Sequence, residues 1–198
     1  MSSKDWIKGI FQAAATDFAN RCVNGDKRLS PLTEWEAQRI QEGLAKGIFD
    51  INGSVIKTDG GTKEYKFFGF NREYFTHFAM LVEALSWDLP NARIEFEYKH
   101  LDLMIFDNEQ PYIGIEVKKS RKDAETLIAD IFKYLPNPDL NKHDRGMDGL
   151  RKIKYLLEIK PRQFWIVSPE ARWKFEALYS TSNIELKLFE GPEIKQVA

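Results

Sequence analysis

The spacing of apolar residues divides the chain into a mainly helical first part and a strand-rich part that begins near residue 92. In the first part, apolar residues recur every three or four positions, which predicts three amphipathic helices: residues 4–22, 33–45 and 72–87. Thr33 is followed three residues later by Glu36, a capping box that opens the second helix. Residues 54–68 predict a β-hairpin whose arms meet at Asp59-Gly60-Gly61.

After Pro90 the period of the pattern falls from about four residues to two. Alternating apolar and polar positions predict three consecutive strands: residues 93–98, 101–106 and 112–118. The rest of the pattern predicts, in order, helix 122–135, loop 136–149, helix 150–159, strand 163–168, helix 169–179 and strand 184–189. Strands interleaved with helices in this way are typical of an α/β protein.

Length and composition predict one soluble globular domain with an appended part. Of the 198 residues, 43% are apolar and 30% charged, which excludes the disordered and fibrous classes. No apolar stretch approaches the roughly 20 residues that span a membrane, so no membrane partner is expected. The single cysteine, Cys22, excludes an internal disulfide framework and predicts a reducing, cytoplasmic location.

The net charge of −1 conceals an asymmetry along the chain. Residues 1–117 carry 13 Lys and Arg against 18 Asp and Glu, whereas residues 118–174 carry 14 against 8. A basic face beside an acidic site suits the phosphate backbone of a nucleic acid next to a metal ion. The alternative interpretation is that the basic segment forms solvated helices that bind nothing.

Two acidic residues on neighbouring predicted strands form the most informative pattern. Side chains alternate between the two faces of a strand. A regular hairpin around a turn at 107–111 therefore places Asp102 opposite Glu116 and Met104 opposite Gly114. Directly opposed carboxylates repel each other, and the glycine leaves space beside them. This arrangement predicts a bound cation.

Lys118 shares the face of Glu116 and indicates the chemistry of that cation site. A hard divalent ion such as Mg²⁺ favours one or two carboxylates together with water and phosphate oxygens. A lysine beside it can orient the attacking water or stabilise charge that develops on a phosphoryl group. The alternative is a solvent-facing strand edge at which acid and lysine simply pair. The same register places His100 opposite Lys118, and an exposed turn histidine is the alternative there.

Among the six Glu-x-Lys sequences in the chain, Glu116-Val117-Lys118 alone ends a strand, follows a strand aspartate and precedes a helix. With Asp102 fourteen positions upstream, it resembles the active-site motif of the PD-(D/E)xK nuclease superfamily. This resemblance covers about residues 72–190. It implies a restriction-endonuclease-like core, a mixed central sheet flanked by helices in the order αβββαβ. It also divides the chain into a mainly helical N-terminal extension with a β-hairpin, residues 1–71, and a nuclease-like domain, residues 72–198.

The resemblance implies a role for each residue of the motif. Asp102, Glu116 and the carbonyl of Val117 would bind Mg²⁺, for which Mn²⁺ is expected to substitute. Lys118 would position the attacking water. Replacing Asp102 or Glu116 by alanine is expected to abolish cleavage and leave the fold intact, because the change relieves repulsion between the two acids.

Four further features are less specific. A third acid often lies on the preceding helix of such nucleases, where Glu83 is the matching candidate metal ligand. Glu97 competes for that role if a tight turn at Lys99-His100 brings it opposite Asp102. Tyr134 matches the tyrosine of a motif found in RecB-like members, although the glutamine of that motif is absent. The loop 136–149 either clamps DNA or is simply mobile.

The implied activity is metal-dependent hydrolysis of phosphodiester bonds in DNA. The alternative is a catalytically inactive module of the same fold that binds nucleic acid or a protein partner, and such a module would not need a divalent ion. Cutting both strands of a duplex commonly takes two active sites, so a homodimer is also expected.

Overall fold

The structure, a computed structural model, describes residues 32–46, 48, 55–58, 61–64, 73–181 and 183–189. Its helices are α2 (Glu34–Ala45), α3 (Glu73–Leu85), α4 (Arg121–Tyr134) and α5 (Asp148–Ile159). Its strands are β1 (Val55–Thr58), β2 (Gly61–Glu64), β3 (Ala92–Tyr98), β4 (Leu101–Asp107), β5 (Gln110–Val117), β6 (Gln163–Val167), β7 (Arg172–Tyr179) and β8 (Ile184–Leu188). The expected helix 4–22 and the turn residues Asp59 and Gly60 lie outside the described part.

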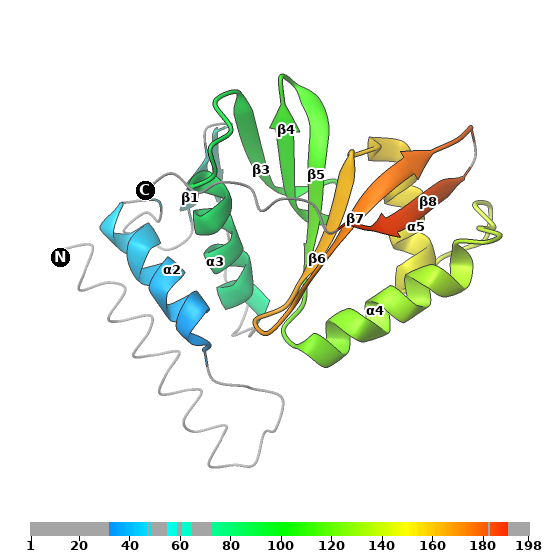
Figure 1. The fold of residues 1–198 in the computed structure, drawn as a ribbon, viewed down its shortest axis with the longest axis horizontal. Coiled ribbons are helices and arrows are strands. Elements are labelled where there is room, and N and C mark those ends of the chain that lie inside the picture. The colour runs from blue at the N-terminus through cyan, green and yellow to red at the C-terminus, as the bar shows by residue number, and fades with distance from the viewer. Residues whose placement is uncertain are drawn as a thin grey trace, which may run out of the picture.

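Six strands form a mixed sheet in the order β3-β4-β5-β6-β7-β8, in which β5 and β6 run parallel and the other neighbours antiparallel. Figure 1 shows α2 and α3 on one side of this sheet and α4 and α5 on the other. One buried cluster lies beneath α3, and a second beneath α4 and α5. The expected α/β fold with a mixed central sheet is therefore confirmed. None of the described helices has the length and apolar character needed to cross a bilayer.

Local signals in the sequence set where the helices begin. The backbone N–H of Thr33 donates to Glu36 Oε2 at 2.9 Å, and the N–H of Glu36 donates to Thr33 Oγ1 at 3.3 Å. These reciprocal bonds confirm the predicted capping box of α2. At the start of α4, Ser120 Oγ accepts from the N–H of Asp123 at 3.2 Å. Helix α4 therefore begins at Arg121, three residues after Lys118.

Tight turns join the first three strands of the sheet. Lys99 and His100 adopt φ angles of 43° and 71° between β3 and β4. Asn108 and Glu109 adopt φ angles of 48° and 61° between β4 and β5. Positive φ at both central residues is what a two-residue type I′ hairpin turn requires. The tight turn considered at Lys99-His100 is therefore confirmed.

The second hairpin differs from the prediction near its turn. Asp107 pairs with Gln110, so the five-residue turn expected at 107–111 is wrong. A register shift between residues 105 and 106 makes Phe106 face Pro111, whereas the regular hairpin around 107–111 would place Tyr112 there. Because this bulge offsets the shorter turn, the register further along the strands is the expected one.

The helix predicted at 169–179 is wrong: the segment forms strand β7. Trp173 and Ala177 have the four-residue spacing of a helix, but Phe175 and Tyr179 alternate with them at strand spacing. These side chains join or pack against the cluster beneath α5. Strand β6 is buried along its whole length, so both of its edges need backbone partners, and β7 supplies the second.

Candidate active site

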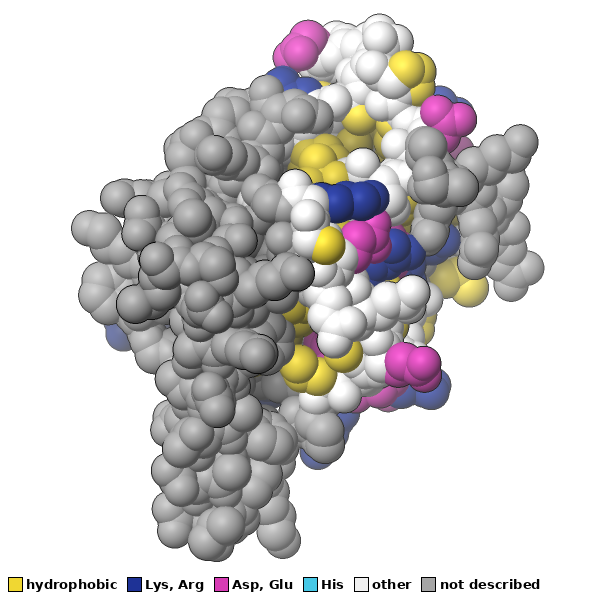
Figure 2. All heavy atoms as spheres, turned by 90° about the vertical axis from the view of Figure 1, so that its left-hand side faces the viewer, with side chains coloured by type: hydrophobic (Ala, Val, Ile, Leu, Met, Phe, Trp, Pro, Cys, Tyr) yellow, Lys and Arg dark blue, Asp and Glu magenta, His cyan; other side chains and the backbone are white. Residues whose placement is uncertain are grey.

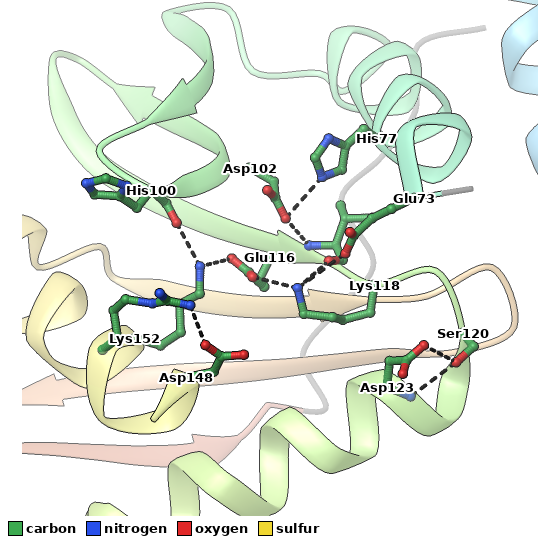
Figure 3. A network of polar contacts seen from close by, with 12 residues as sticks. Glu73, His77, His100, Asp102, Glu116, Lys118, Ser120, Asp123, Asp148 and Lys152 are labelled. Atoms are coloured by element: carbon green, nitrogen blue, oxygen red, sulfur yellow. Dashed lines mark hydrogen bonds and ion pairs between the residues drawn. The ribbon is translucent and has the colours of Figure 1, made fainter. Parts of the chain in front are cut away.

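The two predicted acids lie where the sheet splits. The pairing of β4 with β5 includes Met104 opposite Gly114, as predicted, and extends to Leu103 opposite Ile115. Beyond that point β5 continues beside β6 as far as Val117. Asp102 and Glu116 are the next residues on the separating strands, and Figure 3 shows them side by side.

The carboxylate of Asp102 replaces the backbone partner that Val117 loses at the split. The N–H of Val117 donates to Asp102 Oδ2 at 2.6 Å. His77 Nε2, from α3, lies 3.1 Å from the same oxygen. Burial raises the pKa of Asp102, but His77, Lys118 and the Val117 N–H outweigh it and lower the pKa to about 2. Asp102 is therefore ionised at neutral pH.

Glu116 is 4% exposed and is held by two lysines. Lys118 Nζ donates to Glu116 Oε1 at 2.7 Å, and Lys152 Nζ donates to Oε2 at 2.5 Å. Burial and the neighbouring Asp102 raise the pKa of Glu116 above its usual value, although both lysines act in the opposite direction. Cations of the protein itself thus offset part of the repulsion that the sequence predicts.

Lys118 extends from the end of β5 into a group of oxygens. Besides Glu116, its Nζ donates to the carbonyl of Val117 at 2.9 Å and to Glu73 Oε1 at 3.3 Å. Burial lowers the pKa of Lys118, but Glu116, Glu73 and Asp102 outweigh burial and raise it. Lys118 is therefore an ammonium donor at neutral pH, and it lies beside Glu116 as predicted.

The third acid of the group is Glu73, and the prediction of Glu83 is corrected. Glu73 opens α3 and reaches Lys118, whereas Glu83 lies near the other end of the helix. Ten residues separate them, which is roughly 15 Å along a helix. Glu83 is 3% exposed, accepts from Trp35 and pairs with Arg172. The side chain of the competing candidate Glu97 lies outside the described part.

Lys152, on α5, joins Glu73 and His77 as a residue of the group that the sequence analysis did not predict. Its helix is amphipathic, and a lysine there reads as part of the solvated face. The structure instead buries Lys152 to 7% exposure and makes it donate to the carbonyl of His100 at 2.7 Å. The predicted position of His100 opposite Lys118 is wrong, because the tight turn directs its ring onto Tyr155, with centroids 4.6 Å apart.

A cavity of about 790 Å³ opens beside Lys118. The start of α3, one face of α4 and the loop before α5 line it, with four acids and three lysines among the lining residues: Glu73, Asp123, Asp130, Asp148, Lys118, Lys119 and Lys133. On the face drawn in Figure 2, basic and acidic side chains of the described part likewise lie next to one another. Tyr134, at the end of α4, packs against the core.

Carboxylate and carbonyl oxygens that could bind a hard cation are present, although they are not arranged as a complete set of metal ligands. Within the described residues, no three His, Cys, Asp or Glu side chains are arranged to hold a metal ion. Asp102 Oδ1 accepts no hydrogen bond from any described residue, and Glu116 and the Val117 carbonyl lie nearby. Two carboxylates and a carbonyl fit the preference of Mg²⁺ for oxygen, provided that Lys118 moves aside.

Known proteins supply no independent evidence for the site. No family model, no curated protein and no solved structure matches the chain. Any function must therefore be argued from the residues themselves.

Proposed function

We propose that the chain is a metal-dependent nuclease of the PD-(D/E)xK type that hydrolyses phosphodiester bonds in DNA. The observation that supports this most is the convergence of Asp102, Glu116 and Lys118 at the end of β5. The order α3-β3-β4-β5-α4, followed by α5 and a β6 parallel to β5, is compatible with a restriction-endonuclease-like αβββαβ core.

Asp102, Glu116 and the carbonyl of Val117 would hold Mg²⁺, with Mn²⁺ able to replace it. A bound divalent ion supplies a water of lowered pKa and stabilises negative charge on the phosphoryl group. Because the pKa of Lys118 is raised, this residue acts as a hydrogen-bond donor and not as a base. Its ammonium would orient the attacking water or neutralise a phosphate oxygen.

The cavity beside Lys118 would admit the nucleic acid. Lys118, Lys119 and Lys133 line it and would contact phosphates, which makes the affinity for DNA depend on salt. The proposal includes a homodimer, in which two sites would cut both strands of a duplex. It also includes a cytoplasmic location, which the single cysteine predicts.

A cleavage assay on linear, circular and branched DNA tests this function. The wild type and Glu116→Ala are compared with Mg²⁺, with Mn²⁺ and with EDTA, and Glu185→Ala serves as the control. Glu185 belongs to another Glu-x-Lys sequence and is exposed on β8. Cleavage that requires the metal and is lost in Glu116→Ala alone is the expected result. Equal cleavage by Glu116→Ala would refute the site.

One observation favours the alternative, a nucleic-acid-binding module without catalysis. Both oxygens of Glu116 are occupied by lysines of the same chain, so the acid is neutralised without a metal ion. Such a module would bind DNA with the same affinity in EDTA and in Mg²⁺, and that affinity would fall as the salt concentration rises. It would cut no substrate. That combination of results would replace the nuclease proposal.

A further inference from the structure

The two lysines on Glu116 are held in different ways. Lys152 Nζ lies between two fixed acceptors, Glu116 Oε2 at 2.5 Å and the carbonyl of His100 at 2.7 Å. The side chain of Lys118 is 22% exposed against 9% for Lys152, and it lines the cavity. One ammonium is enclosed by the fold, and the other faces open space.

The acceptors available to each lysine differ as well. Lys118 can leave Glu116 and the carbonyl of Val117, both assigned to the metal ion, and still donate to Glu73 Oε1, which lies 3.3 Å away. Among the described residues, Lys152 has one acceptor besides Glu116, the turn carbonyl of His100. If Lys152 left Glu116, its buried charge would lose its counter-ion, which is costly in an apolar environment.

Helix α5 holds Lys152 in place through its contact with α4. The N–H of Gly149 donates to Asp130 Oδ2 at 2.7 Å, close to the start of α5. A Cβ at position 149 would overlap backbone atoms of Asp130 and Ile131, so the helices touch at this point. Ile153 and Leu156, which follow Lys152 on α5, are fully buried. The position of Lys152 is therefore fixed by the packing of two helices.

We infer that Lys152 is a positioning residue that stays on Glu116 when a divalent cation binds, whereas Lys118 is the lysine that gives way. This inference rests on the proposed metal site. Lys152 would occupy Oε2 permanently and orient the other carboxylate oxygen towards Asp102 and Lys118. Through the carbonyl of His100, the same ammonium connects the β3–β4 turn with α5 at this carboxylate.

Chemical labelling of lysines in the wild-type protein tests the inference directly. Accessible amines are acetylated with and without Mn²⁺, and each site is quantified by mass spectrometry. We expect Mn²⁺ to increase labelling of Lys118 several-fold and to leave Lys152 protected in both states. Lys187, with a side chain 55% exposed on β8, should be labelled equally throughout and serves as the control. A rise in Lys152 labelling that matches the rise in Lys118 labelling would overturn the inference.

The affinity for Mn²⁺ alone, measured by calorimetry, provides the second test. Removing a group that orients a metal ligand typically costs about 10- to 100-fold in affinity, so this loss is expected for Lys152→Met. Lys118→Met should bind Mn²⁺ at least as tightly as the wild type, since the ion no longer displaces an ammonium. Lys152→Arg, which keeps the charge, should recover part of the loss.

The outcomes separate the inference from the proposed function. Wild-type binding of Mn²⁺ with unchanged or tighter binding by Lys152→Met would overturn the inference and leave the metal site standing. No binding by the wild type or by Lys118→Met would overturn the metal site itself. Thermal melting in EDTA shows whether each variant folds. If Lys152→Met does not fold, the labelling of the wild type decides.

Discussion

Replacement of Asp102 by asparagine should destabilise the fold, contrary to the expectation from the sequence. Sequence reasoning predicts that removing this charge relieves repulsion with Glu116. In the structure, His77 and Lys118 instead make the ionised form of Asp102 the favourable one. The amide oxygen of asparagine can still accept from the N–H of Val117, so the substitution tests the charge alone.

The magnitude follows from the pKa. A pKa lowered from 3.8 to about 2 corresponds to about 2 kcal/mol, since each pKa unit is worth about 1.4 kcal/mol. Because the folded-state pKa lies below the unfolded one, the unfolded chain binds more protons in acid. The stabilisation is therefore present above pH 3.8 and is lost as the pH falls towards 2.

Urea unfolding in EDTA, followed by circular dichroism at pH 7, 5, 4 and 3, measures this contribution. The free energy of unfolding of Asp102→Asn should lie about 2 kcal/mol below that of the wild type at pH 7, and the gap should narrow below pH 4. Asp88→Asn, at an exposed aspartate, is the control and should show no gap. An Asp102→Asn protein as stable as the wild type at pH 7 would refute the view that protein cations balance this acid.

Three further substitutions test other parts of the structure. Gly149→Ala should cost about 1–3 kcal/mol in thermal unfolding, because the added methyl group meets the backbone of α4; an unchanged melting temperature would contradict this close contact. Glu83→Gln should cost about 2 kcal/mol or more by leaving Arg172 partly unpaired, yet calorimetry should find its affinity for Mn²⁺ unchanged. Burial lowers the pKa of His77, but neighbouring acids outweigh burial and raise it above 6.5. The stabilisation that His77 gives the folded state is therefore present below pH 6.5 and disappears above the folded-state pKa. The difference in unfolding free energy between wild type and His77→Gln should thus shrink as the pH rises. A difference that grows would exclude the ion pair between His77 and Asp102.

Where the backbone signal is local, the sequence predicted the structure well. The capping box at Thr33 and Glu36 needs four consecutive residues, and it begins α2 as expected. The alternation around Asp102 and Glu116 placed both acids at one point of the sheet, because the period of a strand is two whatever surrounds it. The register survived an incorrect turn because a bulge compensated for it.

Patterns that fit two structures were resolved only by tertiary contacts. The apolar residues of β7 satisfy both helical and strand spacing, and the unpaired edge of buried β6 decided between them. Likewise, Glu73 and Glu83 both lie on α3, so the pattern alone cannot select the acid that meets the strand ends. The packing of the helix against the sheet brings Glu73 to Lys118 and Glu83 to Arg172.

The sequence by itself thus determined which residues meet at the candidate site: Asp102, Glu116 and Lys118. Tertiary structure decided how their charges are balanced, by adding Glu73 and His77 from α3 and Lys152 from α5. The physical reason is the distance over which each kind of interaction acts. Hydrophobic period and capping act over a few neighbouring residues, whereas a charge is compensated by whatever lies within a few ångströms in space, however distant in the chain.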